Sequence, residues 1–187
     1  MDTKSLLIET ATTLFQQKGY KAVGLNEILK ACNVTKGALY HHFPNGKDEL
    51  LLTCLHVLKE GITSDIKYIF SKHSTTEDAI VSMINKLVNS FEKDGTISGY
   101  TFSSIVSEMA TMSEPVRTAC SDLYEKIERM YCNKLLEDGF SNETAASISL
   151  LLTASIEGAM MLSLTQQSTE PLKTIAKLLP TLLKSFY

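Results

Sequence analysis

The sequence is poor in the residues that break helices and contains no Trp. Its 187 residues include only 4 Pro and 9 Gly. So few breakers argue against a turn-rich β protein and against a disordered chain, while apolar residues, at 44 %, are numerous enough to build a buried core. The composition therefore predicts a globular, mostly helical protein with one domain, or with a small domain joined to a larger one.

The cysteines do not follow the spacing of a metal or redox motif. Cys32, Cys54, Cys120 and Cys132 form no CxxC pair, and no signal-peptide pattern precedes them. Cys120 and Cys132 would fall about 120° apart on one helix, which argues against a disulfide or a shared metal there. We therefore expect reduced cysteines that pack in the core of a cytoplasmic protein.

Sequence motifs of catalysis are also absent. No GxGxxG, GxSxG or HExxH occurs, and Gly46-Lys47 lacks the earlier Gly of a phosphate-binding loop, because His41 stands at that position. His41 and His42 are adjacent, so on a helix they diverge by about 100° and cannot share one metal ion. The sequence predicts neither an enzyme nor a cofactor or metal site.

The chain also lacks a large excess of charge of either sign, but its charges are unevenly distributed. The net charge of −3 by itself argues weakly against a nucleic-acid partner. However, residues 1–50 hold six Lys against five acids, whereas residues 51–187 hold twelve Lys and Arg against sixteen acids. The N-terminal part therefore differs in sign from the rest of the chain and keeps a nucleic-acid partner possible.

One stretch is almost long and apolar enough to span a membrane. From Ala145 to Thr165 the only charged residue is Glu157. Seven positions in this stretch are polar, and no Lys or Arg flanks it closely. We therefore expect a helix that is covered by protein on both sides.

Apolar periodicity and capping residues predict an all-α protein with about nine helices and no strands. The expected helices cover residues 3–18, 25–32, 35–43, 47–71, 74–93, 102–112, 114–137, 142–166 and 171–185. The fifth of these begins with a capping-box pattern, Ser74-x-x-Glu77.

The second and third expected helices form a helix-turn-helix pattern. Asn33 tolerates the left-handed backbone of a sharp turn, and Thr35 is a helix-capping residue. Leu39 and Phe43 would face the core, which leaves the start of the third helix facing outward. In such motifs the second helix lies in the DNA major groove, but short helix pairs also occur in bundles without DNA function. A helical adaptor that binds another protein therefore stays open as an alternative.

Residues 24–50, GLNEILKACNVTKGALYHHFPNGKDEL, resemble the DNA-binding region of the TetR family of bacterial transcriptional regulators. The end of this segment, FPNGKDEL, is similar to the LmrA/YxaF-like branch, as is the later Ile156-Glu157-Gly158-Ala159. The resemblance implies a DNA-binding domain at residues 1–46 and a ligand-binding and dimerisation domain at residues 47–187. It also implies a repressor that a ligand releases from double-stranded DNA.

The resemblance assigns DNA contacts residue by residue. Tyr40 and Lys47 match positions that grip backbone phosphates. Positions facing bases or phosphates on the recognition helix are matched by Thr35, Lys36, Gly37, Ala38, His41 and His42. The chemistry of these side chains agrees, because a hydroxyl and the amides of a helix N-terminus bind phosphate, and small residues allow close approach to a groove.

Two positions depart from the family pattern. Gly24 stands where most members have a capping Thr or Ser, so a phosphate contact there falls to a backbone amide or to Asn26. Asn33 replaces the usual turn Gly. Neither departure disrupts the helix-turn-helix motif.

The C-terminal part offers candidates for a ligand pocket and a dimer interface. Rings and thioethers suit adaptable apolar sites, so an apolar or aromatic effector would contact Phe91, Tyr100, Phe102, Met109 and Tyr124. Plain core packing is an equally good interpretation of each of these residues. The apolar stretch 145–165, with Ala154 and Gly158 allowing close helix approach, predicts a two-fold dimer. The family resemblance implies that the last helix joins it in a four-helix interface.

Overall fold

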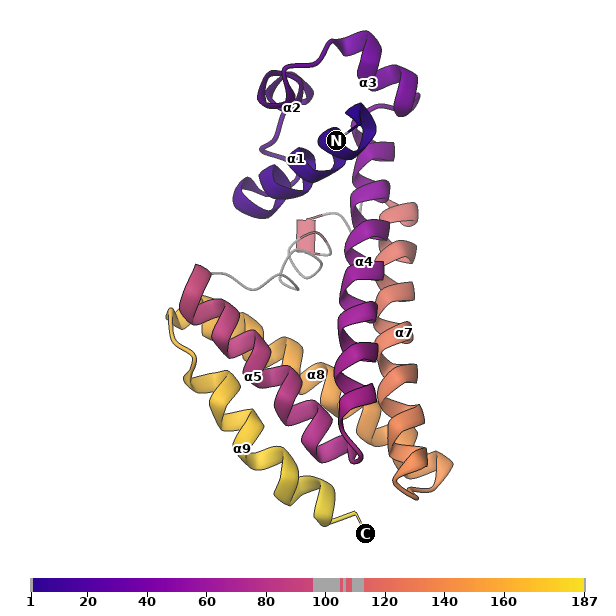
Figure 1. Cartoon of the computed structure of the whole chain (residues 1–187), viewed down its shortest axis with the longest axis vertical. Coiled ribbons are helices and arrows are strands. Elements are labelled where there is room, and N and C mark those ends of the chain that lie inside the picture. The colour runs from indigo at the N-terminus through magenta and orange to yellow at the C-terminus, as the bar shows by residue number, and fades with distance from the viewer. Residues whose placement is uncertain (1, 96–104, 106, 109–112, 187) are drawn as a thin grey trace. The chain divides into compact units, whose positions relative to one another are not determined.

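The computed structural model of the chain describes residues 2–95, 105, 107–108 and 113–186, and its architecture is all-α, as predicted (Figure 1). Among these residues there is no strand, and there are eight labelled helices: α1 (Thr3–Lys18), α2 (Leu25–Cys32), α3 (Lys36–His42), α4 (Lys47–Lys72), α5 (Thr76–Asp94), α7 (Glu114–Glu137), α8 (Asn142–Gln166) and α9 (Glu170–Lys184). The helix expected at residues 102–112 lies mostly outside the described residues, although 105, 107 and 108 are helical.

The chain forms two compact units, and helices α4 and α7 contribute residues to both. The first unit comprises Met1–Gly61 and Thr101–Asp122, and the second comprises Ile62–Tyr100 and Leu123–Tyr187. The division predicted between residues 46 and 47 concerns function rather than compactness, so it stays a prediction.

In the first unit, α1 packs against α2 and α3 (Figure 1). The apolar stripe of α1 forms the centre of this packing, with Leu7 and Ala11 fully buried and Phe15 nearly so. Helix α1 ends at Gly19, whose φ of 79° is a backbone conformation that glycine adopts without a steric penalty. The predicted stop of this helix is therefore confirmed.

In the second unit, α9 packs against both α5 and α8. The buried apolar positions of α9 are Leu172, Leu179 and Leu183. On α5, Ile80 and Ile84 are fully buried. At the edge of this contact, Lys173 Nζ lies 2.8 Å from Glu92 Oε1. Helix α9 is therefore amphipathic, and Pro171 lies in its first turn.

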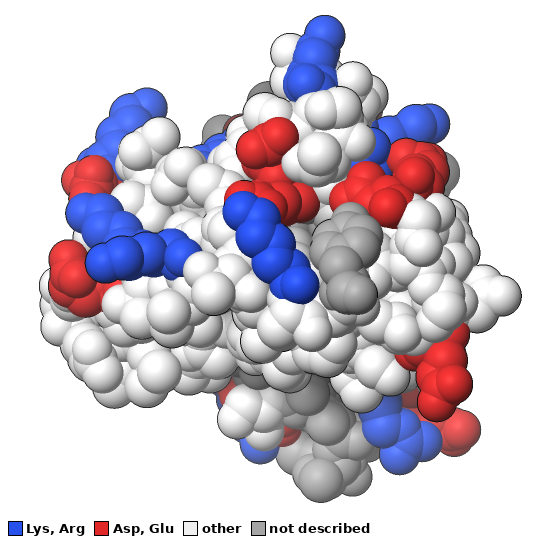
Figure 2. Space-filling view, turned by 90° about the horizontal axis from the view of Figure 1, so that it is seen from below, with Lys and Arg blue, Asp and Glu red and all other residues white. Residues whose placement is uncertain are grey.

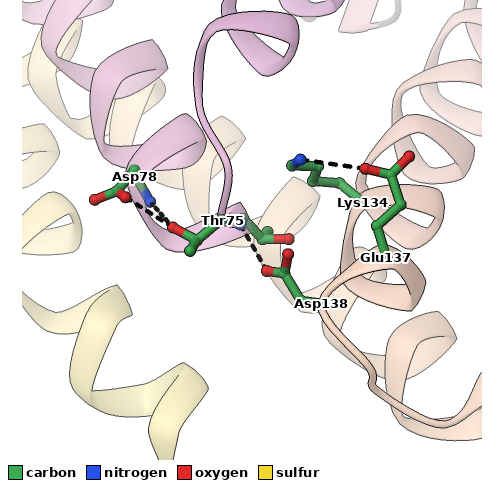
Figure 3. A network of polar contacts seen from close by, with 6 residues as sticks. Thr75, Asp78, Lys134, Glu137 and Asp138 are labelled. Atoms are coloured by element: carbon green, nitrogen blue, oxygen red, sulfur yellow. Dashed lines mark hydrogen bonds and ion pairs between the residues drawn. The ribbon is translucent and has the colours of Figure 1, made fainter.

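The start of α5 differs by one residue from the predicted cap (Figure 3). The N-cap is Thr75, not Ser74, and its Oγ1 accepts the Asp78 amide at 3.1 Å. The same hydroxyl donates to Asp78 Oδ2 at 2.9 Å. Asp78, not Glu77, is therefore the acidic residue that bonds to the cap, and its carboxylate accepts the cap hydroxyl rather than the backbone amide of a capping box. The next amide, at Thr76, donates to Asp138 Oδ2 at 2.6 Å.

Helix α8 is buried along one face only within this chain. Nine of its 25 residues are buried, whereas Leu150 and Leu162 are 58 % and 50 % exposed. The expectation of protein on both sides is therefore not met by the single chain. Among the described residues, α8 is also the one helix whose length and composition would suit a membrane span. A core helix of a soluble protein can have the same properties, so this is weak support for a membrane role.

Candidate nucleic-acid interface

Helices α2 and α3 have the predicted helix-turn-helix geometry. Three residues separate them, and the first, Asn33, has the left-handed backbone (φ 53°, ψ 43°) predicted from its identity. The turn is closed by two backbone hydrogen bonds, from Asn33 N to Lys30 O at 3.2 Å and from Val34 N to Leu29 O at 3.0 Å. This closure fixes the direction in which α3 leaves α2.

The first turn of α3 presents small and polar groups to solvent. Thr35 is the N-cap, and its Oγ1 accepts the Ala38 amide at 3.2 Å. Thr35, Lys36 and Gly37 are exposed and Ala38 is half-buried, while Leu39 is fully buried. An exposed helix N-terminus with one cation and small side chains can approach a phosphate and the base edges in a DNA groove.

Tyr40 lies at the edge of this surface with its ring 41 % exposed. Lys36 Nζ lies 5.7 Å from the centre of the Tyr40 ring, within the range of a cation–π interaction. The ring also packs beside Gly46, where an added Cβ would lie 3.4 Å from the ring edge. The phenol and the ammonium are thus neighbours on one accessible surface.

The two histidines complete the C-terminal part of α3. His41 is exposed and His42 is half-buried, and their ring centres lie 5.0 Å apart in an edge-to-face arrangement. Across the described residues, no group of three or more His, Cys, Asp or Glu is placed to hold a metal ion. Each imidazole can donate or accept a hydrogen bond, and His41 is the more accessible of the two.

Lys47, the first residue of α4, is more enclosed than its predicted role suggests. Its Nζ donates to the Tyr20 carbonyl at 2.6 Å and lies 3.8 Å from the centre of the Tyr20 ring. Burial lowers the pKa of this ammonium, and the charges of Asp48 and Glu108 oppose that effect. An ammonium has three N–H groups, so the bond to Tyr20 leaves Lys47 able to donate to a phosphate as well.

The start of α2 is uncapped by a side chain, as the sequence predicts. Gly24 is the N-cap, makes no side-chain capping bond, and is exposed. Asn26 is exposed in the first turn of the same helix. Backbone amides and the Asn26 amide are therefore the groups that this end of the helix can offer to a phosphate.

Three polar residues of the first unit, Tyr20, Asp48 and Glu108, were not found by sequence reasoning. Tyr20 is buried and its hydroxyl donates to Asp48 Oδ1, so burial and this bond raise the pKa of the phenol. Glu108 accepts the backbone amide of Lys21 at 3.0 Å. Tyr20 and Asp48 are 28 positions apart, and Lys21 and Glu108 are 87 apart. No local spacing links such distant residues.

The candidate ligand residues are only partly covered by the structure. Phe91 is buried on α5, and Tyr124 is half-buried on α7, where its hydroxyl donates to Glu157 Oε2 at 3.3 Å. Tyr100, Phe102 and Met109 lie outside the described residues. In the same unit, Tyr131 stacks on Phe70 with ring centres 5.7 Å apart.

Comparison with known proteins identifies both parts of the chain. Residues 7–54 match the family of bacterial regulatory proteins called tetR, and residues 76–178 match the LmrA/YxaF-like C-terminal domain of transcriptional regulators. Over 183 residues, covering 98 % of this chain, the sequence is 37 % identical to the uncharacterized HTH-type transcriptional regulator YxaF of Bacillus subtilis, of which it covers 96 %. It is 34 % identical to the regulator LmrA of the same organism, covering 98 % of this chain and 97 % of LmrA.

A solved structure supports the fold over nearly the whole chain. The crystal structure of reduced Escherichia coli NemR superposes with a TM-score of 0.85 at 25 % identity, covering 94 % of this chain and 95 % of NemR. The TetR family consists of transcriptional regulators rather than enzymes, in agreement with the missing catalytic motifs. The chain belongs to the TetR family of helix-turn-helix DNA-binding transcriptional regulators, with an LmrA/YxaF-like C-terminal domain.

Proposed function

We propose that this regulator is a cytoplasmic repressor that binds a near-palindromic operator as a homodimer and is released by a small apolar or aromatic ligand. NemR of Escherichia coli, 30 % identical over 122 residues, is named a repressor. The observation that carries the proposal is the exposed first turn of α3, where Thr35, Lys36 and Gly37 are accessible beside the phenol of Tyr40. In a helix-turn-helix protein this is the part that reaches the bases.

The proposed DNA contacts fall into two classes. Tyr40, Lys47 and Lys36 neutralise or hydrogen-bond phosphates and set the orientation of α3. The residues that would contact base edges are Thr35, Gly37, Ala38, His41 and His42. Asn26 and the backbone amides of α2 would contact the neighbouring DNA phosphates. Contacts of the first class make affinity depend on salt, and those of the second class make it depend on sequence.

The dimer would form through α8 and α9. Leu178 on α9 is 56 % exposed, and Leu150 and Leu162 are exposed on α8. Between the two helices lies a groove of about 490 Å³ whose lining includes Ala154 and Gly158. Figure 2 shows broad uncharged areas on the face it views, with charged side chains scattered over them. These exposed leucines, together with the small lining residues Ala154 and Gly158, suit close packing against a second copy of the same two helices.

Ligand release requires two states of the dimer with different affinities for DNA. To change operator occupancy from 99:1 to 1:99, the ligand must prefer the DNA-incompetent state by about 5.5 kcal/mol, which two identical pockets can share. We propose that Phe91, Tyr100, Phe102, Met109 and Tyr124 contribute to each pocket. Phe102→Ala is then expected to raise the ligand concentration needed for release while leaving ligand-free operator affinity nearly unchanged. Equal loss of both would identify Phe102 as ordinary core.

The decisive experiment sequences the genomic DNA fragments that the purified protein retains. The expected result is a small set of fragments that share a near-palindrome, with half-sites about 34 to 36 Å apart along the duplex. Binding to a synthetic duplex of that sequence should weaken steeply as salt increases. A flat salt dependence and no enriched sequence would favour the alternative, a helical adaptor that binds proteins.

A further inference from the structure

The loop between α1 and α2 is held at several points within the first unit. Val23 is fully buried and Tyr20 is buried, so the loop is part of the core rather than a loose connection. The Tyr20 hydroxyl donates to Asp48, and its carbonyl accepts Lys47 Nζ at 2.6 Å. The position of this loop matters for DNA binding because α2 begins directly after it, at Leu25.

Glu108 fixes the same loop from a distant part of the sequence. Its Oε2 accepts the Lys21 amide at 3.0 Å, across 87 positions of the chain. Its carboxylate also lies so close to Gly19 that a Cβ there would collide with it. Gly19 therefore serves two purposes: it adopts a φ of 79° and it leaves room for the Glu108 side chain.

The bond between the Glu108 carboxylate and the Lys21 amide is strong enough to restrain the α1–α2 loop. A carboxylate that accepts an amide hydrogen makes a stronger bond than two neutral partners do. The Glu108 charge also acts on Lys47, where it favours the charged ammonium against the effect of burial. One side chain thus influences both the loop before α2 and the first residue of α4.

We propose that Glu108 is a positioning residue for DNA binding, which holds the α1–α2 loop so that the helix-turn-helix is ordered before it meets a duplex. Without this bond the loop keeps its core contacts but is less restricted at Lys21, and the restriction that DNA binding must then impose reduces affinity. The inference adds a residue outside the helix-turn-helix to the proposed function and rests on that function for its DNA readout.

The test compares the full-length protein with its Glu108→Ala and Glu108→Gln variants, and with Glu114→Ala as the matched control. Glu114 belongs to the same unit, but its side chain is 82 % exposed and its ion-pair partner, Arg117, is on the same helix. Two quantities are measured: hydrogen exchange at the Lys21 amide by NMR, and affinity for a duplex taken from the fragments that the wild-type protein retains, at several salt concentrations.

In Glu108→Ala, the Lys21 amide should exchange at least about tenfold faster, and duplex affinity should fall roughly three- to tenfold with an unchanged salt slope. Glu108→Gln, which keeps an acceptor, should lie between Glu108→Ala and wild type, and Glu114→Ala should match wild type. Unchanged Lys21 exchange would overturn the proposal, and so would faster exchange with wild-type affinity. If the wild-type protein retains no duplex at all, the proposed function itself fails, and the role of Glu108 fails with it.

A second set of variants tests the contact through Gly19. Gly19→Ala should weaken duplex binding more in wild type than in the Glu108→Ala background, because removal of the carboxylate frees the space that the methyl group needs. An equal effect in both backgrounds would show that the two residues are independent and would overturn the proposal.

Discussion

The recognition helix α3 and the long helix α8 expose opposite kinds of residue: α3 exposes polar groups and α8 exposes leucines. Helix α3 has seven residues, of which only Leu39 is buried, and it leaves its polar first turn open to solvent. Helix α8 has 25 residues and exposes leucines on the side away from the core of its unit. Exposed polar groups on a short helix need no covering, whereas exposed leucines on a long helix favour a partner.

Because of this difference, α3 can make its contacts within one chain, whereas α8 needs a second chain. Helix α3 can contact DNA as one copy, since its contacts are local and its cap, Thr35, lies beside the surface it presents. Helix α8 would act only through a second chain, which would place two copies of α3 on one operator. Changes in the two helices should therefore have different signatures.

The largest effect is expected from a charge on the exposed face of α8. Leu162→Glu would bury a carboxylate in the proposed dimer interface, so the protein should sediment as a monomer at micromolar concentration. Operator affinity should fall about a hundredfold or more, because the two half-sites no longer act together. Val57→Glu is the matched control, since Val57 on α4 is 49 % exposed, close to the 50 % of Leu162. A monomeric wild-type protein in the same measurement would disprove the interface.

The next largest effect is expected from the two lysines near α3. Removal of one phosphate-binding ammonium should reduce the slope of log affinity against log salt by about 0.9, or about two units for both halves of a dimer. Lys36→Ala and Lys47→Ala should each show this reduction and weaken binding to all duplexes alike. Lys93→Ala, at the end of α5, should leave the slope unchanged. An unchanged slope for Lys47→Ala would restrict that residue to its contact with Tyr20.

Tyr40→Phe removes one hydroxyl and should have a smaller effect. If that oxygen donates to a phosphate, operator binding should weaken by about 1 to 3 kcal/mol with little change in the salt slope. Titration of labelled duplex into both proteins measures the loss. Tyr68→Phe changes an even more exposed tyrosine, on the part of α4 that belongs to the second unit, and should have no effect.

Helix caps allow a direct comparison of α3 and α5, because loss of either cap should reduce the free energy of unfolding by the same amount. Thr35 caps α3 and Thr75 caps α5 (Figure 3), so Thr→Ala at either position should reduce the free energy of unfolding by about 1 kcal/mol. Only Thr35→Ala should also weaken operator binding, because only that hydroxyl lies on the proposed DNA surface. Thr→Ser at each position keeps the cap and should restore stability in urea melts. Weaker DNA binding by Thr75→Ala would contradict this separation.

The smallest effect concerns acid stability of the second unit. The hydrogen bond and the charge of Lys173 hold the pKa of Glu92 below its ordinary value of 4.5. A carboxyl with a lowered pKa contributes stability that is complete above pH 4.5 and is lost as pH falls through the lowered pKa. Glu92→Gln should therefore flatten the acid side of the melting-temperature profile slightly, while operator binding at neutral pH stays unchanged. An identical acid profile would mean that this exposed pair contributes nothing measurable.

Local signals allowed the described helices to be predicted with small errors. Gly19, Asn33 and Asp138-Gly139 interrupt the apolar pattern, and each has a backbone preference that ends a helix by itself. The cap of α5 was misplaced by one residue because Ser74 and Thr75 are both capping residues. The choice between them depends on Asp78, which bonds to Thr75 in both directions.

The exposure of the first turn of α3 could be predicted for the same reason, since Thr35, Leu39 and Phe43 are one turn apart on one short helix and its caps. The sequence by itself determined the all-α fold, the helix-turn-helix and the outward side of α3, because backbone preference and apolar spacing act over a few residues. Only the tertiary structure placed Lys47 on the Tyr20 carbonyl, Asp48 on the Tyr20 hydroxyl and Glu108 on the Lys21 amide. Such contacts join residues that are up to 87 positions apart, and chain folding, not local spacing, decides which distant groups meet.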